Sequence, residues 1–165
     1  MPERAFQDFY ADQVSHCYGC GRLNPHGLQI KTRWEGEDSV TRFRPRPEHL
    51  AIPGFVYGGL IASLVDCHGT ATAAAAKYRA EGRAMDTSPP FRFVTASLHV
   101  DYLRPTPLDA ELEIRGQVTE QAERRVVVAV TVLANGVITA RGNVVAVTMP
   151  KSFEQPAAPE VKEQR

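Results

Sequence analysis

One apolar stretch, residues 53–76, limits what this chain can fold into more than any other. It reads PGFVYGGLIASLVDCHGTATAAAA, and its apolar residues recur with the 3.6-residue period of a helix. We expect a turn at the Pro-Gly pair and a helix from about Tyr57 onward. The run of alanines suits a helix that other elements wrap closely, so the pattern predicts the buried central helix of the fold.

A single carboxylate, Asp66, lies in the middle of this predicted helix between Val65 and Cys67. An acid at such a position is a poor choice for packing alone. Upstream, Gly58 and Gly59 let a ligand approach the backbone closely, and the first N–H groups of a helix are free to bind an anion or oxyanion. Judged from the residues alone, Asp66 is equally well explained as a functional acid or as a structural acid that is paired with a backbone amide or an arginine.

The segments around this helix have β character. Alternating or valine-rich patterns and turn residues predict six strands, at residues 28–34, 39–44, 96–102, 110–118, 125–133 and 137–149. We interpret the last four as an antiparallel meander, with turns at residues 104–107 and at Asn135-Gly136. One apolar helix can be buried only if the sheet curls round it. The prediction is therefore an α+β fold with a curved antiparallel sheet wrapped around one long helix.

The length of 165 residues suits one domain with a single core, which we place at residues 15–149. The N-terminal segment, residues 1–14, has aromatic residues at helical spacing and is expected to form a short helix over residues 3–13. Residues 150–165 are rich in Pro, Glu, Lys and Ala, which predicts a disordered tail.

Charge and hydropathy narrow the range of partners. The chain has 19 basic and 19 acidic residues and no basic tract, so we expect no nucleic-acid partner. The longest apolar run, residues 55–65, is too short to span a bilayer, and the first residues carry charges where a signal peptide needs an apolar core. We therefore expect a cytoplasmic protein with no membrane partner.

The three cysteines are an odd number and do not have the spacing of a secreted disulfide scaffold. Cys17 and Cys20 form a C-x-x-C flanked by His16 and His26. A structural zinc site needs four ligands, normally as two spaced pairs, and no second pair exists. The pattern favours two reduced thiols in a compact loop over a zinc site, with Cys67 as a small buried residue, so no metal and no cofactor are expected.

Three segments together resemble a known family. They are CYGCGRLNPHGL at residues 17–28, PGFVYGG followed by Asp66, and TASLHVDYLRPTPL at residues 95–108. In this order and spacing they are similar to hotdog-fold acyl-CoA thioesterases of the 4-hydroxybenzoyl-CoA thioesterase superfamily, in its phenylacetate-pathway and human-type branch. The resemblance covers residues 17 to about 148. It implies the hotdog fold and hydrolysis of an acyl-CoA thioester to free acid and CoA at a homodimer interface.

The resemblance also implies roles for particular residues. Asp66 matches the catalytic carboxylate, which acts as general base or nucleophile, and Gly58 and Gly59 match the oxyanion-binding glycines. Thr95 matches a threonine that assists the water or the acid in some members. Tyr57 stands where the family usually has histidine; its hydroxyl can still donate a hydrogen bond, but it is longer and reaches a different place.

Other candidates lie around this centre. His49 precedes the glycines and is expected at the entrance of the site. Arg92 and Arg104 flank turns, where they are either ordinary surface residues or contacts for the phosphates of coenzyme A. His68 should point away from Asp66 on a helix and is predicted to be a packed or dimer-facing histidine. The polar face with His99 and Asp101 is either solvated or pairs with a second dimer, which would make a homotetramer.

The spacing along the helix predicts a shared site. Asp66 follows Tyr57 by nine residues, which span roughly 13 Å of helix. One carbonyl therefore cannot contact Asp66 and the glycine amides of the same helix, and antiparallel helices across a two-fold axis would give two equivalent sites.

Three functions compete: an acyl-CoA thioesterase, an inactive acyl-CoA-binding protein that lost turnover with the histidine, and a hydratase or dehydratase. The third needs a histidine paired with an acid in the site, and only His49 could fill that role. The pattern does not specify the acyl group.

Overall fold

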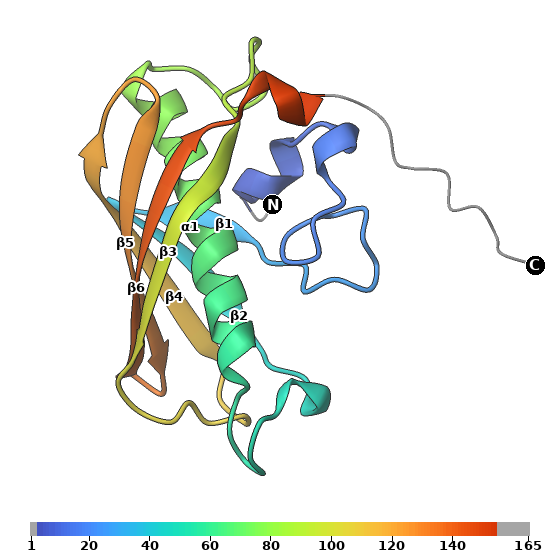
Figure 1. Cartoon of the computed structure of the whole chain (residues 1–165), viewed down its shortest axis with the longest axis vertical. Coiled ribbons are helices and arrows are strands. Elements are labelled where there is room, and N and C mark those ends of the chain that lie inside the picture. The colour runs from blue at the N-terminus through green and yellow to red at the C-terminus, as the bar shows by residue number, and fades with distance from the viewer. Residues whose placement is uncertain (1–2, 155–165) are drawn as a thin grey trace, which may run out of the picture.

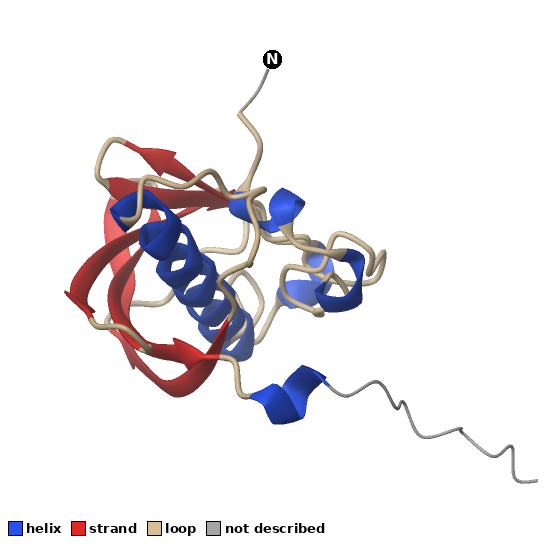
Figure 2. Ribbon diagram, turned by 90° about the horizontal axis from the view of Figure 1, so that it is seen from above, coloured by secondary structure: helices blue, strands red, loops and turns tan. Residues whose placement is uncertain are grey.

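The computed structural model describes residues 3–154, which form a six-stranded antiparallel sheet curved around one long helix (Figures 1 and 2). The helix, α1, spans Gly58–Ala80. The strands are β1 (Thr32–Glu35), β2 (Asp38–Phe43), β3 (Phe93–Tyr102), β4 (Leu112–Gln121), β5 (Arg125–Ala134) and β6 (Val137–Thr148). Their order in the sheet is β1-β2-β4-β5-β6-β3. The predicted α+β architecture is confirmed.

Small residues let α1 lie close against the sheet. The helix buries Leu60, Ile61 and Leu64 near its start and a run of alanines near its end. At Gly69, an added Cβ would lie 2.5 Å from a methyl group of Val144 on β6, so the helix backbone itself touches the strand. The inward valines of β5 complete the core. The apolar stretch is thus the buried central helix that its pattern predicts.

The predicted four-stranded meander is wrong in one strand. β4, β5 and β6 are consecutive neighbours, and Asn135 and Gly136 make the β5–β6 turn with φ values of 51° and 76°. β3, however, pairs with β6 instead of β4. The amides of Leu103 and Arg104 both donate to the Thr139 carbonyl of β6, at 2.8 and 3.0 Å, so the chain leaves β3 alongside β6. Residues 103–111 then cross the end of the sheet to β4 (Figure 1).

β3 also differs from its predicted half-buried pattern. Most of its residues are exposed, including Leu98 and Tyr102, although the strand is ten residues long. The reason is its position: β3 pairs with β6 on one side and, within residues 3–154, with no strand on the other. The alternating apolar residues that predict a buried face therefore lie at an open edge of the sheet.

The N-terminal segment forms two 3₁₀ turns, η1 (Phe6–Phe9) and η2 (Asp12–Val14), where one short helix is predicted. Contacts with β1 hold the first turn in place, because the Gln7 side chain exchanges two hydrogen bonds of 2.9 Å with Thr32. Asp8 accepts from the Ala5 amide and pairs with Lys31. Each turn is held separately by tertiary contacts.

The predicted first strand begins too early. Leu28 and Ile30 donate their amides to Tyr18 and Gly19 in the preceding loop, at 2.8 and 3.0 Å, so these residues pair with the loop before β1 begins. The predicted disordered tail also begins too early, because Lys151–Glu154 form a 3₁₀ turn, η4; residues 155–165 lie outside the described part. Among residues 3–154, no helix has the length and apolar character that crossing a bilayer requires.

Candidate active site

Asp66 and Thr95 meet on the inner side of the sheet edge. Asp66 projects from the middle of α1, and the Thr95 hydroxyl of β3 donates a hydrogen bond to its Oδ1. Both residues line a cavity of about 300 Å³, whose other walls come from further residues of α1, the N-terminal segment, the C-x-x-C loop, residues 91–94 and Met149. The carboxylate is half-buried and therefore both held in place and accessible from the cavity.

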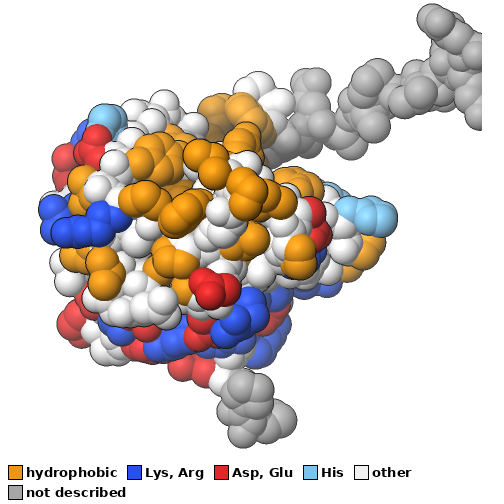
Figure 3. Space-filling model, turned by 90° about the horizontal axis from the view of Figure 1, so that it is seen from below, with side chains coloured by type: hydrophobic (Ala, Val, Ile, Leu, Met, Phe, Trp, Pro, Cys, Tyr) orange, Lys and Arg blue, Asp and Glu red, His pale blue; other side chains and the backbone are white. Residues whose placement is uncertain are grey.

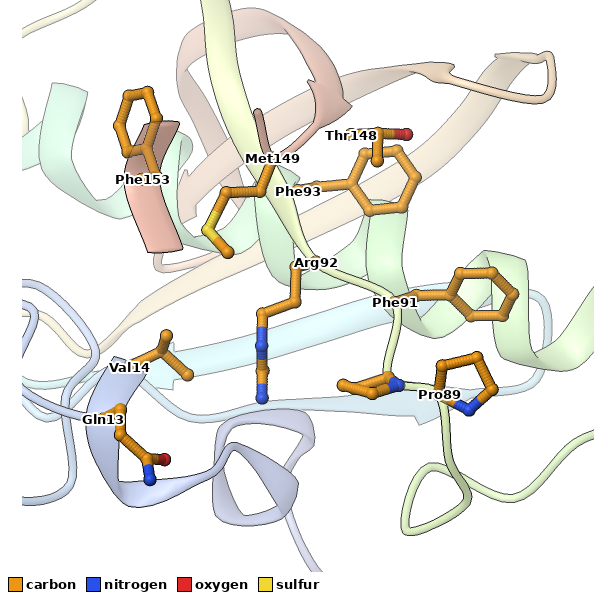
Figure 4. A pocket seen from close by; sticks show the side chains of 10 residues that line it. Gln13, Val14, Pro89, Phe91, Arg92, Phe93, Thr148, Met149 and Phe153 are labelled. Atoms are coloured by element: carbon orange, nitrogen blue, oxygen red, sulfur yellow. The ribbon is translucent and has the colours of Figure 1, made fainter. Parts of the chain in front are cut away.

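A wider apolar cleft of about 620 Å³ adjoins this cavity. The two share lining residues, namely Val14, Phe91, Arg92, Phe93 and Met149. Figure 4 shows Arg92 extending between β3 and the N-terminal turn that carries Gln13 and Val14. The structure thus places Arg92 where the two spaces join, with mostly apolar side chains around it.

The start of α1 presents free backbone donors. Tyr57 is the N-cap, and the N–H groups of Gly58 and Gly59 have no acceptor within residues 3–154. The Tyr57 ring lies over Gly59, where an added Cβ would be 2.4 Å from it, yet the tyrosine is 57% exposed. The Tyr102 hydroxyl donates to the Gly58 carbonyl at 2.7 Å. Sequence reasoning missed this anchor, because strand alternation does not report which strand end meets the helix start.

His49 does not line the cavity beside Asp66. It is only 8% exposed; its Nδ1 accepts from the Arg46 amide at 3.0 Å, and its ring stacks on Phe43. Burial, and then the charge of Arg46, lower its pKa. Its carbonyl accepts the Tyr57 amide at 2.8 Å, so His49 supports the backbone that leads into the helix.

The two candidate phosphate contacts do not converge within one protomer. Arg92 directly precedes β3, and Arg104 follows its other end. The guanidinium of Arg104 donates to the Ile138 carbonyl at 2.9 Å. Any ligand that used both arginines would have to extend along the whole strand or reach a second subunit.

Comparison with known proteins decides the family. Residues 53–147 match the family described as the thioesterase superfamily. A solved thioesterase superfamily protein from Shewanella loihica PV-4 is 45% identical, with a TM-score of 0.65; the match covers 86% of this chain and 100% of that one.

This chain belongs to the thioesterase superfamily.

Two more distant structures share the fold of this thioesterase superfamily member. The PaaI protein of the E. coli phenylacetic acid degradation operon is 16% identical, with a TM-score of 0.60 over 74% of this chain and 81% of that one. The smu.793 protein of Streptococcus mutans UA159, solved bound to acetyl CoA, is 20% identical, with a TM-score of 0.58 over 73% of this chain and 88% of that one. No curated protein matches the chain. The fold is therefore the hotdog fold of the superfamily.

His68, two residues from Asp66, faces the opposite side of the helix. Its Nδ1 lies 2.9 Å from the Thr41 hydroxyl and its Nε2 lies 2.9 Å from the Ser39 hydroxyl. The Thr41 hydroxyl also lies 2.9 Å from the Thr32 hydroxyl, and Thr32 accepts from the Gln7 amide, so the ring belongs to a buried polar network. Burial lowers the pKa of His68 to about 3. The predicted packed histidine is confirmed.

The thiols of this superfamily member gather beside Asp66. Cys17, Cys20 and Cys67 all line the smaller cavity. Contact with the Cys20 and Cys67 thiols lowers the pKa of Cys17, whereas contact with Cys17 raises the pKa of Cys20 to about 12 and also raises that of Cys67. Sequence spacing showed only the C-x-x-C pair, because Cys67 is fifty positions away from Cys17 and joins it through the fold.

Proposed function

We propose that the protein hydrolyses acyl-CoA thioesters as a homodimer, with Asp66 as the carboxylate that acts on the thioester. The observation that carries this proposal is the Asp66–Thr95 contact at the wall of an accessible cavity. A carboxylate placed for stability alone would be closed off from the cavity or paired with a cation. Superfamily membership supports the reaction type.

Asp66 has the freedom that the chemistry needs. Hydrolysis requires either a base that removes a proton from the attacking water or a nucleophile that attacks the carbonyl carbon. Thr95 donates to Oδ1, and within residues 3–154 no side-chain or backbone donor contacts the other carboxylate oxygen, which is therefore available for either role. A single turnover in ¹⁸O-labelled water tests the nucleophile role: label found in Asp66 would show a mixed anhydride that water opens at the Asp66 carbonyl carbon.

The oxyanion donors of this proposal are the N–H groups of Gly58 and Gly59. Gly59 lies seven residues before Asp66, about 10 Å along the helix. A thioester carbonyl at one Asp66 is therefore out of reach of the glycines of its own helix. The partner subunit supplies those donors, and each dimer then has two equivalent sites.

Two surfaces support dimer formation. The ten-residue edge strand β3 leaves backbone groups available for pairing. At the end of the molecule where α1 begins, Figure 3 shows apolar side chains gathered on one face. The large apolar side chains exposed on the neighbouring segments are Leu50, Ile52, Phe55, Tyr57, Tyr102 and Leu103. A contiguous apolar face of this kind marks an interaction site.

In this arrangement the apolar cavity takes the acyl group, and arginine side chains contact the CoA phosphates. A related structure, that of smu.793, holds acetyl CoA. Because Arg92 and Arg104 lie at opposite ends of β3, we assign them to phosphate contacts from different subunits. The exposed His99–Asp101 pair, joined at 3.0 Å, is the proposed contact for a second dimer in a homotetramer.

The decisive experiment measures free-thiol release from a panel of acyl-CoAs. Asp66→Asn keeps the shape of the side chain and should lower kcat about 10²–10⁴-fold while acyl-CoA binding persists. Glu37→Gln, which neutralises a fully exposed carboxylate on the β1–β2 turn, should change nothing. If the wild type releases thiol from none of the substrates but binds them, the protein is an acyl-CoA-binding protein instead, as the tyrosine at position 57 would favour.

Subunit mixing tests the shared site. Gly58→Pro removes one N–H at the first helical position, where proline is tolerated and Tyr57 is already extended. Gly58→Ala adds a Cβ but keeps the N–H, so it is the matched control; that Cβ approaches the Tyr102 ring no closer than 3.4 Å. Loss of one donor should cost about 10²–10³-fold in kcat.

Homodimers of Asp66→Asn and of Gly58→Pro should both be inactive. After subunits are exchanged in equal amounts, half of the dimers are mixed and each carries one intact site, so about a quarter of wild-type activity should return. A mixture that stays inactive, although mixed dimers have formed, would place both groups in one subunit and contradict the shared site.

A further inference from the structure

Three thiols from two distant parts of the chain converge beside α1. Cys17 and Cys20 come from the loop after η2, and Cys67 comes from the helix. All three sulfur atoms lie within 4.8 Å of one another, and none is in a disulfide. The Sγ atoms of Cys17 and Cys67 are 3.8 Å apart. The hydrolysis proposed above assigns no chemical step to these thiols.

The separations match those of a tetrahedral thiolate site. Zinc–sulfur bonds are about 2.3 Å long, and two sulfurs at a tetrahedral angle are then about 3.8 Å apart. Cys17 and Cys67 already have this separation. The remaining pairs need to close by about 1 Å at most, which a rotation of the side chains can provide.

The backbone around the cluster is built to hold the thiols together. An added Cβ at Gly19 would lie 2.3 Å from the Cys67 sulfur, so the loop approaches the helix as closely as glycine allows. The Gly21 amide donates to the Cys17 carbonyl at 2.8 Å, and the Gln29 side chain donates to the Gly21 carbonyl at 2.8 Å. A site held before the ion binds does not pay the ordering cost of a flexible loop.

The fourth ligand position is open to the cavity. Cys17, Cys20 and Cys67 line the same cavity as Asp66, and Cys17 is exposed. His16 and His26 are exposed and lie outside the cluster of three sulfurs. Three protein ligands and a water in the fourth position is a common arrangement for zinc.

We propose that Cys17, Cys20 and Cys67 form a three-thiolate binding site for Zn²⁺, with water from the cavity as the fourth ligand. Thiolates are soft ligands that select zinc over magnesium or calcium. All three cysteines bind the ion as thiolates, and any of them that is still protonated releases its proton to solvent; binding involves no electron transfer. The ion would fasten the C-x-x-C loop to α1 next to Asp66.

Metal titration of the full-length protein, reduced and treated with chelator, tests the site without any activity assay. Zn²⁺ added in competition with a chromophoric chelator should bind at one ion per chain. Co²⁺ in place of zinc should give the charge-transfer absorption of cobalt–thiolate bonds and the visible bands of a tetrahedral ion. Failure of the folded, reduced protein to take up zinc would overturn the proposal.

Single variants then assign the ligands. Loss of a group that only hydrogen-bonds to a metal ligand costs up to about 100-fold in metal affinity. Loss of a ligand itself should cost at least as much, so Cys17→Ser and Cys67→Ser should each weaken zinc binding by about 100-fold or more. His16→Ala and His26→Ala, the matched controls, should leave it unchanged. Binding that survives Cys67→Ser but is lost in either histidine variant would show a site within the loop alone and refute the helix contribution. Because Cys17 is exposed, its variant remains informative even if Cys67→Ser fails to fold.

Discussion

Asp66 and His68 are two residues apart on one helix and have opposite surroundings. His68 is enclosed, and each ring nitrogen has a hydroxyl partner at 2.9 Å. Asp66 is half-buried, makes its side-chain hydrogen bond to Thr95, and opens onto a cavity. One side of the helix is therefore a closed polar network, and the other is an accessible polar site.

The comparison shows how to tell a structural polar residue from a functional one. Burying a polar group is tolerated when every donor and acceptor is paired, as at His68. A charged group that keeps an unpaired oxygen toward a cavity stabilises the fold less than a paired one would, which is why such groups point to function. The four predictions below test whether the two sides of the helix act independently.

The largest expected effect is the loss of folded-state stability at acid pH that follows from the burial of His68. Its pKa is about 3 in the folded protein, against 6.5 for the free side chain, so below pH 6.5 the unfolded chain takes up a proton that the folded protein excludes. This proton uptake should not change the free energy of unfolding above pH 6.5. Below pH 6.5 it should lower the free energy of unfolding by up to about 1.4 kcal/mol per pH unit, for a total loss of about 4–5 kcal/mol at pH 3.

Urea unfolding at a series of pH values, followed by circular dichroism, measures this loss. His68→Gln can keep hydrogen bonds but cannot titrate, so its stability should depend less steeply on pH than that of the wild type. Equal slopes for the two proteins would mean that His68 is not held neutral.

The second-largest effect is expected when His68, the centre of the buried polar network, is replaced. His68→Leu leaves the buried hydroxyls of Ser39 and Thr41 without their partner and should lower the free energy of unfolding by about 2–4 kcal/mol at pH 7. Hydrolysis per folded molecule should stay within about twofold of the wild type, because the network does not reach the cavity. A large loss of kcat in the folded variant would break the separation between the two sides.

On the open side, Thr95→Val removes the hydroxyl that holds Asp66 and keeps the branched shape. A hydrogen bond to a charged group is worth about 1.5–3 kcal/mol, so kcat/KM should fall about ten- to hundredfold. The free energy of unfolding should change far less than in His68→Leu. Steady-state kinetics and urea unfolding of the same preparation provide both values; an unchanged kcat/KM would remove Thr95 from the site.

The smallest effect is expected at Tyr57. Its ring covers Gly59, and its hydroxyl has no hydrogen-bond partner within residues 3–154. Tyr57→Phe keeps the ring and should change kcat/KM by less than about threefold, or ~0.7 kcal/mol. A loss of a hundredfold or more would show that the hydroxyl acts on the substrate.

Much of the fold follows from local patterns. The period of the apolar stretch predicts α1, and its start at Gly58 lies one residue from the predicted one. Asn135-Gly136 predicts the β5–β6 hairpin, because both residues tolerate positive φ. The N-terminal turns could not be predicted, since Gln7 and Asp8 are held by β1 and Lys31, which lie more than twenty positions away in the chain.

The sequence by itself determined the central helix, the turn chemistry and the presence of an acid in an apolar stretch, because periodicity and backbone propensity act between near neighbours. Only the tertiary structure decided that β3 pairs with β6, that Thr95 meets Asp66, and that Cys67 joins the C-x-x-C loop. These pairings depend on which distant segments lie side by side once the sheet has closed around the helix, and no spacing along the chain encodes that.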